Sequence, residues 1–280
     1  MYRALKIEET VAKLFLWISV IVTLLSLFAI MCHILKEGIG VISWEFLTEY
    51  PEDMGRGGGI FPSIIGTLYL ITVALIFAAP VGILAAIHLT EYTKKGILVN
   101  TIRFATEALA GIPSIIFGLF GFAFLVIFMG FRWSILSGGI TLAIMILPTI
   151  IRTTEEAIRS VPLMYREGSL ALGATKWQTV YKIVIPAALP GIVTGIILGI
   201  GRSVGETAAV LLTAGSSLNL PTSIMDPARS LSIHLFTLAS EGISFKNAYG
   251  TATVLIILIM IINFTANFLM KKMTARTHSY

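Results

Sequence analysis

Long apolar segments separated by short polar connections dominate the chain. A helix needs about 20 consecutive apolar residues to cross the hydrocarbon core of a bilayer. Six segments reach or approach that length, and their apolar residues run continuously instead of alternating with polar ones, which favours helices over a barrel. The pattern predicts an all-α membrane protein with six transmembrane helices, at about residues 14–35, 63–89, 104–129, 135–151, 185–213 and 249–270.

The first apolar segment resembles a signal peptide in its position but not in its length. It follows basic residues and runs from Leu14 to Leu35, which is longer than a cleavable apolar region, and no small-x-small cleavage pattern follows it. We therefore expect a retained first helix. We see no internal repeat, and the spans together predict a single transmembrane domain over residues 1–280.

Composition supports a chain that is solvated mainly by lipid. Hydrophobic residues make up 56% of the sequence and charged residues only 12%, too few to cover a soluble domain of 280 residues. The net charge of +5 is scattered between the spans, which argues against a nucleic-acid partner. The single cysteine, Cys32, excludes an internal disulfide and a cysteine metal site.

Basic residues collect in alternate connections, and this bias orients the chain. Cytoplasmic loops of membrane proteins are enriched in lysine and arginine. The N-terminus, the second connection, the fourth connection (152–184) and the C-terminus carry most of these residues, so we expect both termini to be cytoplasmic. The residues that carry the bias are Arg3, Lys6, Lys13, Lys94, Lys95, Arg103, Arg152, Arg159, Arg166, Lys176, Lys182, Lys271, Lys272 and Arg276.

The fourth connection has the most specific pattern. Residues 164–172 favour a short helix, and Gly173 is placed to end it. Leu170, Trp177 and Tyr181 are too apolar for an exposed loop without a partner. We therefore expect this connection to lie on the cytoplasmic face and to dock on another protein.

This connection resembles the EAA loop of ABC importer permeases. The glutamate, glycine, isoleucine and proline of that motif stand at the family's spacing, while Gly168 and Ser169 replace its two alanines and Ile185 replaces its leucine. The resemblance implies a type I ABC importer permease fold, in which this cytoplasmic coupling helix docks on a separate ATPase. The residues to which it assigns coupling are Glu167, Gly168, Ser169, Leu170, Gly173, Ala174, Trp177 and Pro186.

The fifth span contains two ionisable residues at a depth where charge is costly. Arg202 and Glu206 are four residues apart, so on a helix they share a face and can pair. An arginine fork can hold two oxygens of an oxyanion, and the glutamate can accept a hydrogen bond from a protonated phosphate. We expect a substrate path lined by Arg202, Glu206 and the neighbouring Ser203 and Thr207; a purely structural ion pair is the alternative.

The third span is interrupted by Pro113. A proline removes a backbone donor, and broken helices often line substrate paths, where the freed backbone groups can face an anion. Ser114 is therefore a candidate donor to the same path, with a simple proline kink as the alternative.

These segments together resemble the phosphate ABC importer permeases, and the stretch Gly57-Gly-Gly-Ile60 resembles their A-type subunit. The matching stretches are Gly82–Gly96, Gly111–Gly121 and Gly201–Ala208. The resemblance implies a cell (inner) membrane permease that works with a C-type permease subunit, an ABC ATPase dimer and an extracytoplasmic phosphate-binding protein.

The resemblance also implies that ATP and magnesium are bound by the partner ATPase and not by this chain. The sequence has no Gly-x-x-x-x-Gly-Lys-Ser/Thr motif, so we expect a transport subunit without enzymatic activity or a cofactor of its own. Three alternatives stay open. They are a permease for sulfate, molybdate or another oxyanion, an ATP-independent secondary transporter, and a membrane scaffold or sensor.

Overall fold

A computed structural model describes residues 2–93 and 96–277, and these residues are mainly helical. Lys94 and Lys95, which the predicted orientation uses, lie outside the described residues. A 3₁₀ turn (η1) and π-helical turns (η2, η3, η4) interrupt the α-helices. In chain order the elements are α1 (Tyr2–Ile39), α2 (Trp44–Thr48), β1 (Pro51–Glu52), η1 (Asp53–Gly55), β2 (Gly57–Gly58), α3 (Phe61–Ile87), η2 (His88–Tyr92), α4 (Ile97–Ala110), α5 (Ser114–Gly121), η3 (Phe122–Phe128), α6 (Ile135–Ser160), α7 (Leu163–Ala171), α8 (Lys176–Thr179), η4 (Val180–Val184), α9 (Ile185–Val204), α10 (Ala208–Thr213), α11 (Leu231–Ser240) and α12 (Phe245–Thr277).

The predicted set of six spans is confirmed. Among the described residues, five helical stretches are long and apolar enough to cross a membrane, and a bent pair of helices can form a sixth crossing. The stretches are Glu9–Ile39, Phe61–Tyr92, Ile135–Ser160, Lys176–Val204 and Phe245–Phe268, and the bent pair is Val99–Ala110 with Ser114–Phe128.

Two of the predicted spans are not continuous helices. The third, predicted over 104–129, bends by 100° between α4 and α5, because Pro113 offers no backbone N–H and disfavours a helical conformation at Ile112. The fifth, predicted over 185–213, stops at Val204 and restarts as α10. The fourth is longer than predicted, because α6 continues to Ser160 through a polar segment.

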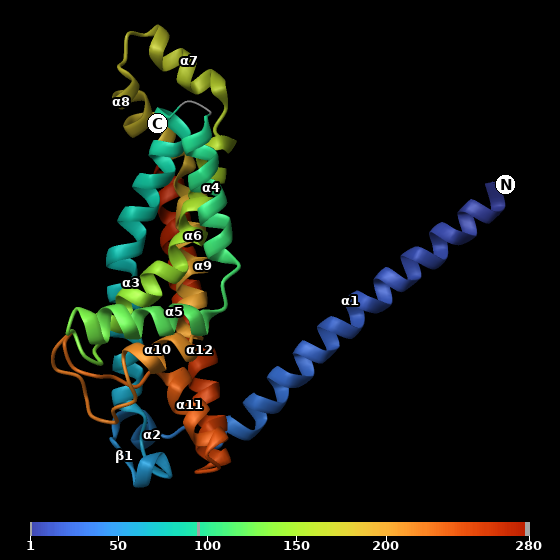
Figure 1. Cartoon of the computed structure of the whole chain (residues 1–280). Coiled ribbons are helices and arrows are strands. Elements are labelled where there is room, and N and C mark those ends of the chain that lie inside the picture. Colours follow the sequence, from blue (N-terminus) through green and yellow to red (C-terminus); the bar gives the residue numbers. More distant parts are fainter. Residues whose placement is uncertain (1, 94–95, 278–280) are drawn as a thin grey trace.

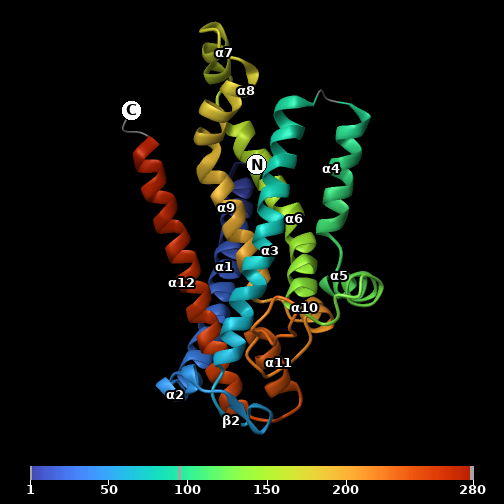
Figure 2. The same ribbon diagram turned by 90° about the vertical axis from the view of Figure 1, so that its left-hand side faces the viewer.

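The elements divide the molecule into two ends (Figures 1 and 2). One end, here called the α7 end, carries α7 and α8, and the C-terminal end of α12 and the N-terminal end of α1 point towards it. The other, here called the α11 end, carries α2, the β1–β2 hairpin and α11. The two termini therefore lie towards the same end as the predicted coupling connection.

Helices α3, α6 and α9 pack against one another as the centre of the bundle. Their contacts bury Leu70, Ile146 and Ile150. Small residues allow the helices to approach closely, since a Cβ added at Gly139 would collide with Val73 of α3, and one added at Gly191 would collide with Ala157 of α6. This packed centre supports the two interrupted spans described below.

Helix α1 lies apart from the bundle and touches it near one end only (Figure 1). There the Thr253 hydroxyl of α12 donates to the Ile34 carbonyl at 3.3 Å, and His33 Nε2 lies 3.3 Å from the Tyr249 hydroxyl. In the most apolar stretch of α1, none of the residues is buried by the rest of the chain. Its apolar surface is therefore left to lipid or to another subunit.

Candidate functional site

The connection between α6 and α9 forms the short helix that its sequence predicts. Helix α7 ends where Gly173 adopts φ +85°, a left-handed conformation that glycine reaches without strain. The Gly173 N–H donates to the Leu170 carbonyl at 3.0 Å, and the Ala174 N–H donates to the Ser169 carbonyl at 3.2 Å. These two bonds are those of a Schellman motif, so the predicted role of Gly173 as the end of the helix is confirmed.

A second short helix follows directly and is tied back to α7. Thr175 and Gln178 form a capping box at the start of α8. The Ser169 and Thr179 hydroxyls, both buried, are 2.9 Å apart, and this contact fixes α8 against α7. Pro186 lies in the first turn of α9, directly after the π-helical turn η4, within a helical stretch that runs from Lys176 to Val204. The motif residues Ser169, Ala174 and Pro186 thus shape the connection from within.

The opposite surface of this connection is apolar and exposed. Leu172 is 90% exposed, Trp177 is 63% exposed and stacks on Tyr181, and Leu170 is half exposed. Glu167 and Gly168 are also exposed, and a Cβ at Gly168 would meet nothing. Large apolar side chains are thus exposed on a protruding element, and the predicted contact with another protein stays a prediction.

Arg166 and Glu91 join this connection to the end of α3, a link that the sequence analysis misses. Arg166 Nε and Nη2 donate to Glu91 Oε1 at 3.1 and 2.8 Å. The signal in the sequence is the pair of opposite charges in two connections on the same predicted side. Because 75 residues separate them, only the tertiary structure brings them together.

The interruption of the fifth span separates Arg202 from Glu206. Arg202 lies in the last turn of α9, whereas Glu206 follows the end of that helix, and its Oε1 accepts from the Ala209 N–H of α10 at 3.2 Å. Within the described part of the chain no ion pair joins them, so the predicted pairing is wrong: Gly205 ends the helix that would have placed them on one face. Arg202 is half-buried and no carboxylate of the described residues lies within 4.0 Å of it.

The two neighbouring hydroxyl groups satisfy their own backbone. The buried Ser203 hydroxyl donates to the Gly199 carbonyl at 3.0 Å, and the Thr207 hydroxyl donates to the Gly205 carbonyl at 3.4 Å. The Glu206 carbonyl accepts from the Ser232 hydroxyl of α11 at 2.7 Å. The interruption is therefore held by its own side chains and by α11.

The two interrupted spans meet at their short helices. A Cβ at Gly118 of α5 would collide with Ala209 of α10, and one at Gly121 would collide with Thr213, so the two helices run in the same direction. The half-buried Ser114 begins α5 one turn before Gly118. The fold thus brings the candidate residues of the third and fifth spans into neighbouring segments, although no hydrogen bond joins Ser114 to the others in the described residues.

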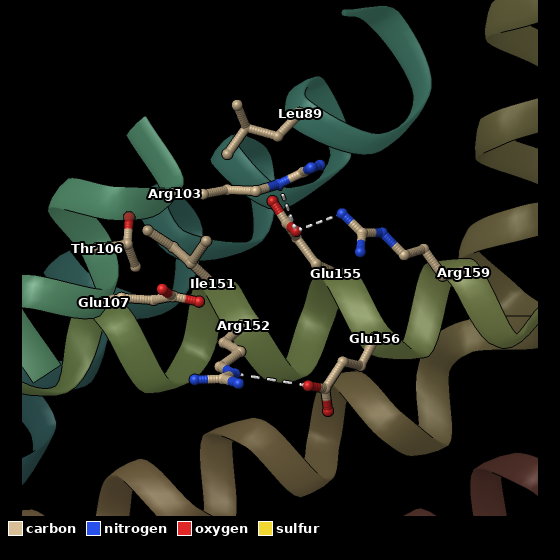
Figure 3. Close-up of a pocket in the computed structure, with 9 residues that line it drawn as sticks. All are labelled: Leu89, Arg103, Thr106, Glu107, Ile151, Arg152, Glu155, Glu156 and Arg159. Carbon is tan, nitrogen blue, oxygen red and sulfur yellow. Dashed lines mark hydrogen bonds and ion pairs between the residues drawn. The ribbon is translucent and has the colours of Figure 1, made fainter. Parts of the chain in front are cut away.

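A charged cavity of about 160 Å³ lies between α4 and α6 (Figure 3). Arg103 of α4 and Arg159 of α6 converge on Glu155 Oε2, at 3.3 and 2.9 Å. The Glu155 side chain is 9% exposed, and its Oε1 has no hydrogen-bond partner among the described residues. The cluster therefore fastens the peripheral helix α4 to the centre of the bundle, and the sequence pattern does not predict it.

A second buried arginine, Arg229, lies at the α11 end. Its Nε and Nη2 donate to the Ser216 carbonyl at 3.3 and 3.1 Å, and its Nη1 lies 3.4 Å from His234 Nδ1. Burial lowers the pKa of Arg229, against an opposing influence of Glu241. Burial and the charge of Arg229 together lower the pKa of His234 to about 4, so this histidine is neutral and accepts from the arginine.

Comparisons with known proteins agree with the architecture. The family model described as "Binding-protein-dependent transport system inner membrane component" matches residues 78–279. The chain is 32% identical to the "Probable ABC transporter permease protein YqgI" of Bacillus subtilis, a match that covers 89% of this chain and 92% of the relative. It is 35% identical to the "Phosphate transport system permease protein PstA" of Mycobacterium leprae, over 92% of this chain and 87% of the relative.

Solved structures share the fold at low sequence identity. A chain of the bacterial alginate ABC transporter in complex with its alginate-bound periplasmic protein matches with a TM-score of 0.70 at 18% identity and covers 93% of each chain. A chain of the inward-facing MetNI methionine ABC transporter matches with a TM-score of 0.64 at 21% identity, over 77% of this chain and 96% of that one.

Proposed function

Because the chain belongs to the binding-protein-dependent transport system inner membrane components, and is therefore a non-enzymatic permease subunit of an ABC importer, we propose that its substrate is phosphate and that it is the A-type permease of the importer. The chain forms half of the translocation path. It passes the state of a separate ATPase to that path through α7 and α8.

The environment of Arg202 carries this proposal. The residue lies where α9 stops, it is half-buried, and no carboxylate neutralises it within ion-pair distance in the described residues. An arginine in a region of low dielectric attracts an oxyanion and can bind two of its oxygens at once. The interruption after Val204 leaves backbone groups beside this arginine that can also face the substrate.

The position of Glu206 favours phosphate over a fully ionised oxyanion. Its Oε1 caps α10, but its Oε2 makes no hydrogen bond within the described part of the chain. That oxygen can accept a hydrogen bond from the O–H group of protonated phosphate. Fully ionised sulfate has no O–H group to donate. The relatives named as phosphate transport permeases support the same substrate, since several of them match about nine tenths of this chain.

The exposed surfaces support the proposed partners. The apolar face of α7 and α8 fits the docking of an ABC ATPase dimer, which binds the ATP and magnesium. Helix α1, which the chain itself leaves uncovered, fits contact with a C-type permease subunit in the bilayer. An extracytoplasmic phosphate-binding protein would then deliver phosphate at the α11 end, with the α7 end and both termini in the cytoplasm of a cell whose inner membrane holds the complex.

The test is uptake of radiolabelled phosphate by cells that lack this gene and other phosphate systems. We expect wild type to restore uptake and Arg202→Gln to reduce it by at least about 100-fold while assembling in the membrane, because an interaction with a charged group is worth several kcal/mol in a low-dielectric site. Arg152→Gln is the matched control, since Arg152 is 66% exposed on α6 and should leave uptake unchanged.

The other outcomes separate the alternatives. Uptake of sulfate or molybdate in place of phosphate would move the chain to another oxyanion importer. Uptake by membrane vesicles without ATP would point to a secondary transporter. Normal phosphate uptake by Arg202→Gln would remove Arg202 from the path.

A further inference from the structure

The π-helical turn η2 at the end of α3 is held by both short helices of the connection between α6 and α9. Arg166 of α7 binds Glu91 of this turn through two nitrogens, at 3.1 and 2.8 Å. Lys176 at the start of α8 places its Nζ 5.2 Å from the centre of the Tyr92 ring, within range of a cation–π contact. Helices α7 and α8 lead into α9 along the chain. The two contacts with η2 connect them to the end of α3 as well.

All three nitrogens of the Arg166 guanidinium donate hydrogen bonds. Its Nη1 donates to the Val161 carbonyl at 2.7 Å, and its Nη2 donates also to the Ile158 carbonyl at 2.8 Å. These carbonyls lie in the last turn of α6 and at the residue that caps it, where carbonyl groups have no partner further along the helix; the Ile158 carbonyl also accepts from the Val161 N–H at 3.3 Å. The side chains of Arg166 and Glu91 are only 17% and 10% exposed, so the ion pair is screened far less than a surface pair.

Helix α3 links this turn to the opposite end of the molecule. Near its first turns, the Thr67 hydroxyl accepts from the Leu231 N–H at the start of α11 at 2.9 Å. A Cβ at Gly66 would lie 2.9 Å from the Arg229 carbonyl, so α3 also touches the backbone that leads into α11. Helix α11 in turn holds the interruption of the fifth span through Ser232 and the Glu206 carbonyl. A displacement of η2 therefore has a continuous packed route to Glu206.

We infer that Glu91 and Arg166 are positioning residues which make α3 move together with α7, so that closure of the ATPase is delivered along α3 to the α11 end. This inference rests on the proposed function. It adds that the receiving element of the coupling helix is η2, and that Glu91 is the residue through which α3 is driven.

The experiment compares variants of the complete complex, reconstituted in lipid nanodiscs with its partner permease, ATPase and binding protein. The readout is the ratio of ATP hydrolysis with phosphate-loaded binding protein to hydrolysis without it. We expect Glu91→Gln and Arg166→Lys each to lower this ratio by about 10-fold, the size of a typical coupling between sites. The double variant should be no worse than either single one, because both remove the same contact.

The matched control is Glu156→Gln, which makes the same chemical change in the Arg152–Glu156 pair of α6, where both side chains are about two thirds exposed. It should leave the ratio unchanged. A ratio equal to wild type in Glu91→Gln, or additive losses in the double variant, would overturn the inference while leaving the proposed function intact.

Hydrogen exchange of residues 163–171 supplies a readout that does not depend on phosphate. These amides should exchange faster in Glu91→Gln than in wild type or Glu156→Gln, because α7 loses its attachment to α3. If the wild-type complex is not stimulated by loaded binding protein, the proposed function fails. Equal exchange in wild type and Glu91→Gln would then overturn the attachment of α7 to α3 as well.

Discussion

The two ends of the molecule place half-buried and buried arginines in opposite surroundings. At the α7 end, Arg166 is bound to Glu91, and Arg103 is bound to the buried Glu155. At the α11 end, Arg229 is more deeply buried than either, at 5% exposed, but its partners are the Ser216 carbonyl and neutral His234. Within the described residues no carboxylate lies within 4.0 Å of it.

The difference separates two uses of the same side chain. At the α7 end each arginine is paired with a carboxylate and serves to fasten helices together, as α7 to α3 and α4 to α6. In the other half of the molecule no carboxylate of the described residues lies within 4.0 Å of Arg229 or Arg202, although Glu241 acts on Arg229 from a greater distance. Each of these two arginines is a local positive charge that can attract an anion.

The largest expected effect on the free energy of unfolding comes from removing the guanidinium group of Arg229. Arg229→Met leaves the half-buried Ser216 carbonyl and the buried His234 Nδ1 without these donors, and we expect a loss of about 3 kcal/mol in the free energy of unfolding. Arg229→Lys keeps the charge but not the planar fork, so its loss should be smaller. Heat-induced unfolding in detergent measures both, and an unchanged midpoint for Arg229→Met would contradict the assigned contacts.

A smaller effect is expected from acid. Since the pKa of His234 is about 4 in the folded chain, below its ordinary value of 6.5, the folded state holds this histidine neutral. Its contribution to stability is complete above the ordinary value and is lost as the pH falls from about 6.5 to about 4, which amounts to about 2 kcal/mol at pH 5. Unfolding midpoints at about pH 8 and about pH 5 measure this loss.

The control for this pH dependence is His234→Asn, whose side-chain oxygen can accept from Arg229 without titrating in this range. The variant should remove the part of the acid sensitivity that belongs to His234. An acid sensitivity identical to that of wild type would show that other groups cause it.

The smallest effect on stability is expected at the α7 end, where α6 carries a buried glutamate and an exposed glutamate at adjacent positions. Glu155→Gln weakens the attachment of α4 and should cost about 1–2 kcal/mol, because Arg103 and Arg159 are partly exposed and regain water. Glu156→Gln alters an ion pair with Arg152 that is about two thirds exposed, and should change stability by less than about 0.5 kcal/mol. Unfolding midpoints in detergent distinguish the two, and equal losses would contradict the assigned difference in burial.

The local sequence was sufficient to predict features that are set by residues adjacent in the chain. The helix over residues 164–172, its end at Gly173 and the exposed apolar side chains beside it follow from helix and capping preferences. The interruption at Pro113 was also visible, since a proline acts on the residues next to it. The pairing of Arg202 with Glu206 failed because the prediction assumed an unbroken helix past Gly205.

Sequence by itself determined that the chain is a bundle of membrane helices, because lipid requires continuous apolar segments whose backbone groups are satisfied internally. It also located the connection that exposes large apolar side chains. Only the tertiary structure decided which charges meet: Arg166 with Glu91 across 75 residues, and Arg229 with His234 in place of any carboxylate. Ion pairs between distant segments depend on how helices pack, and the charge of a single residue does not specify its partner.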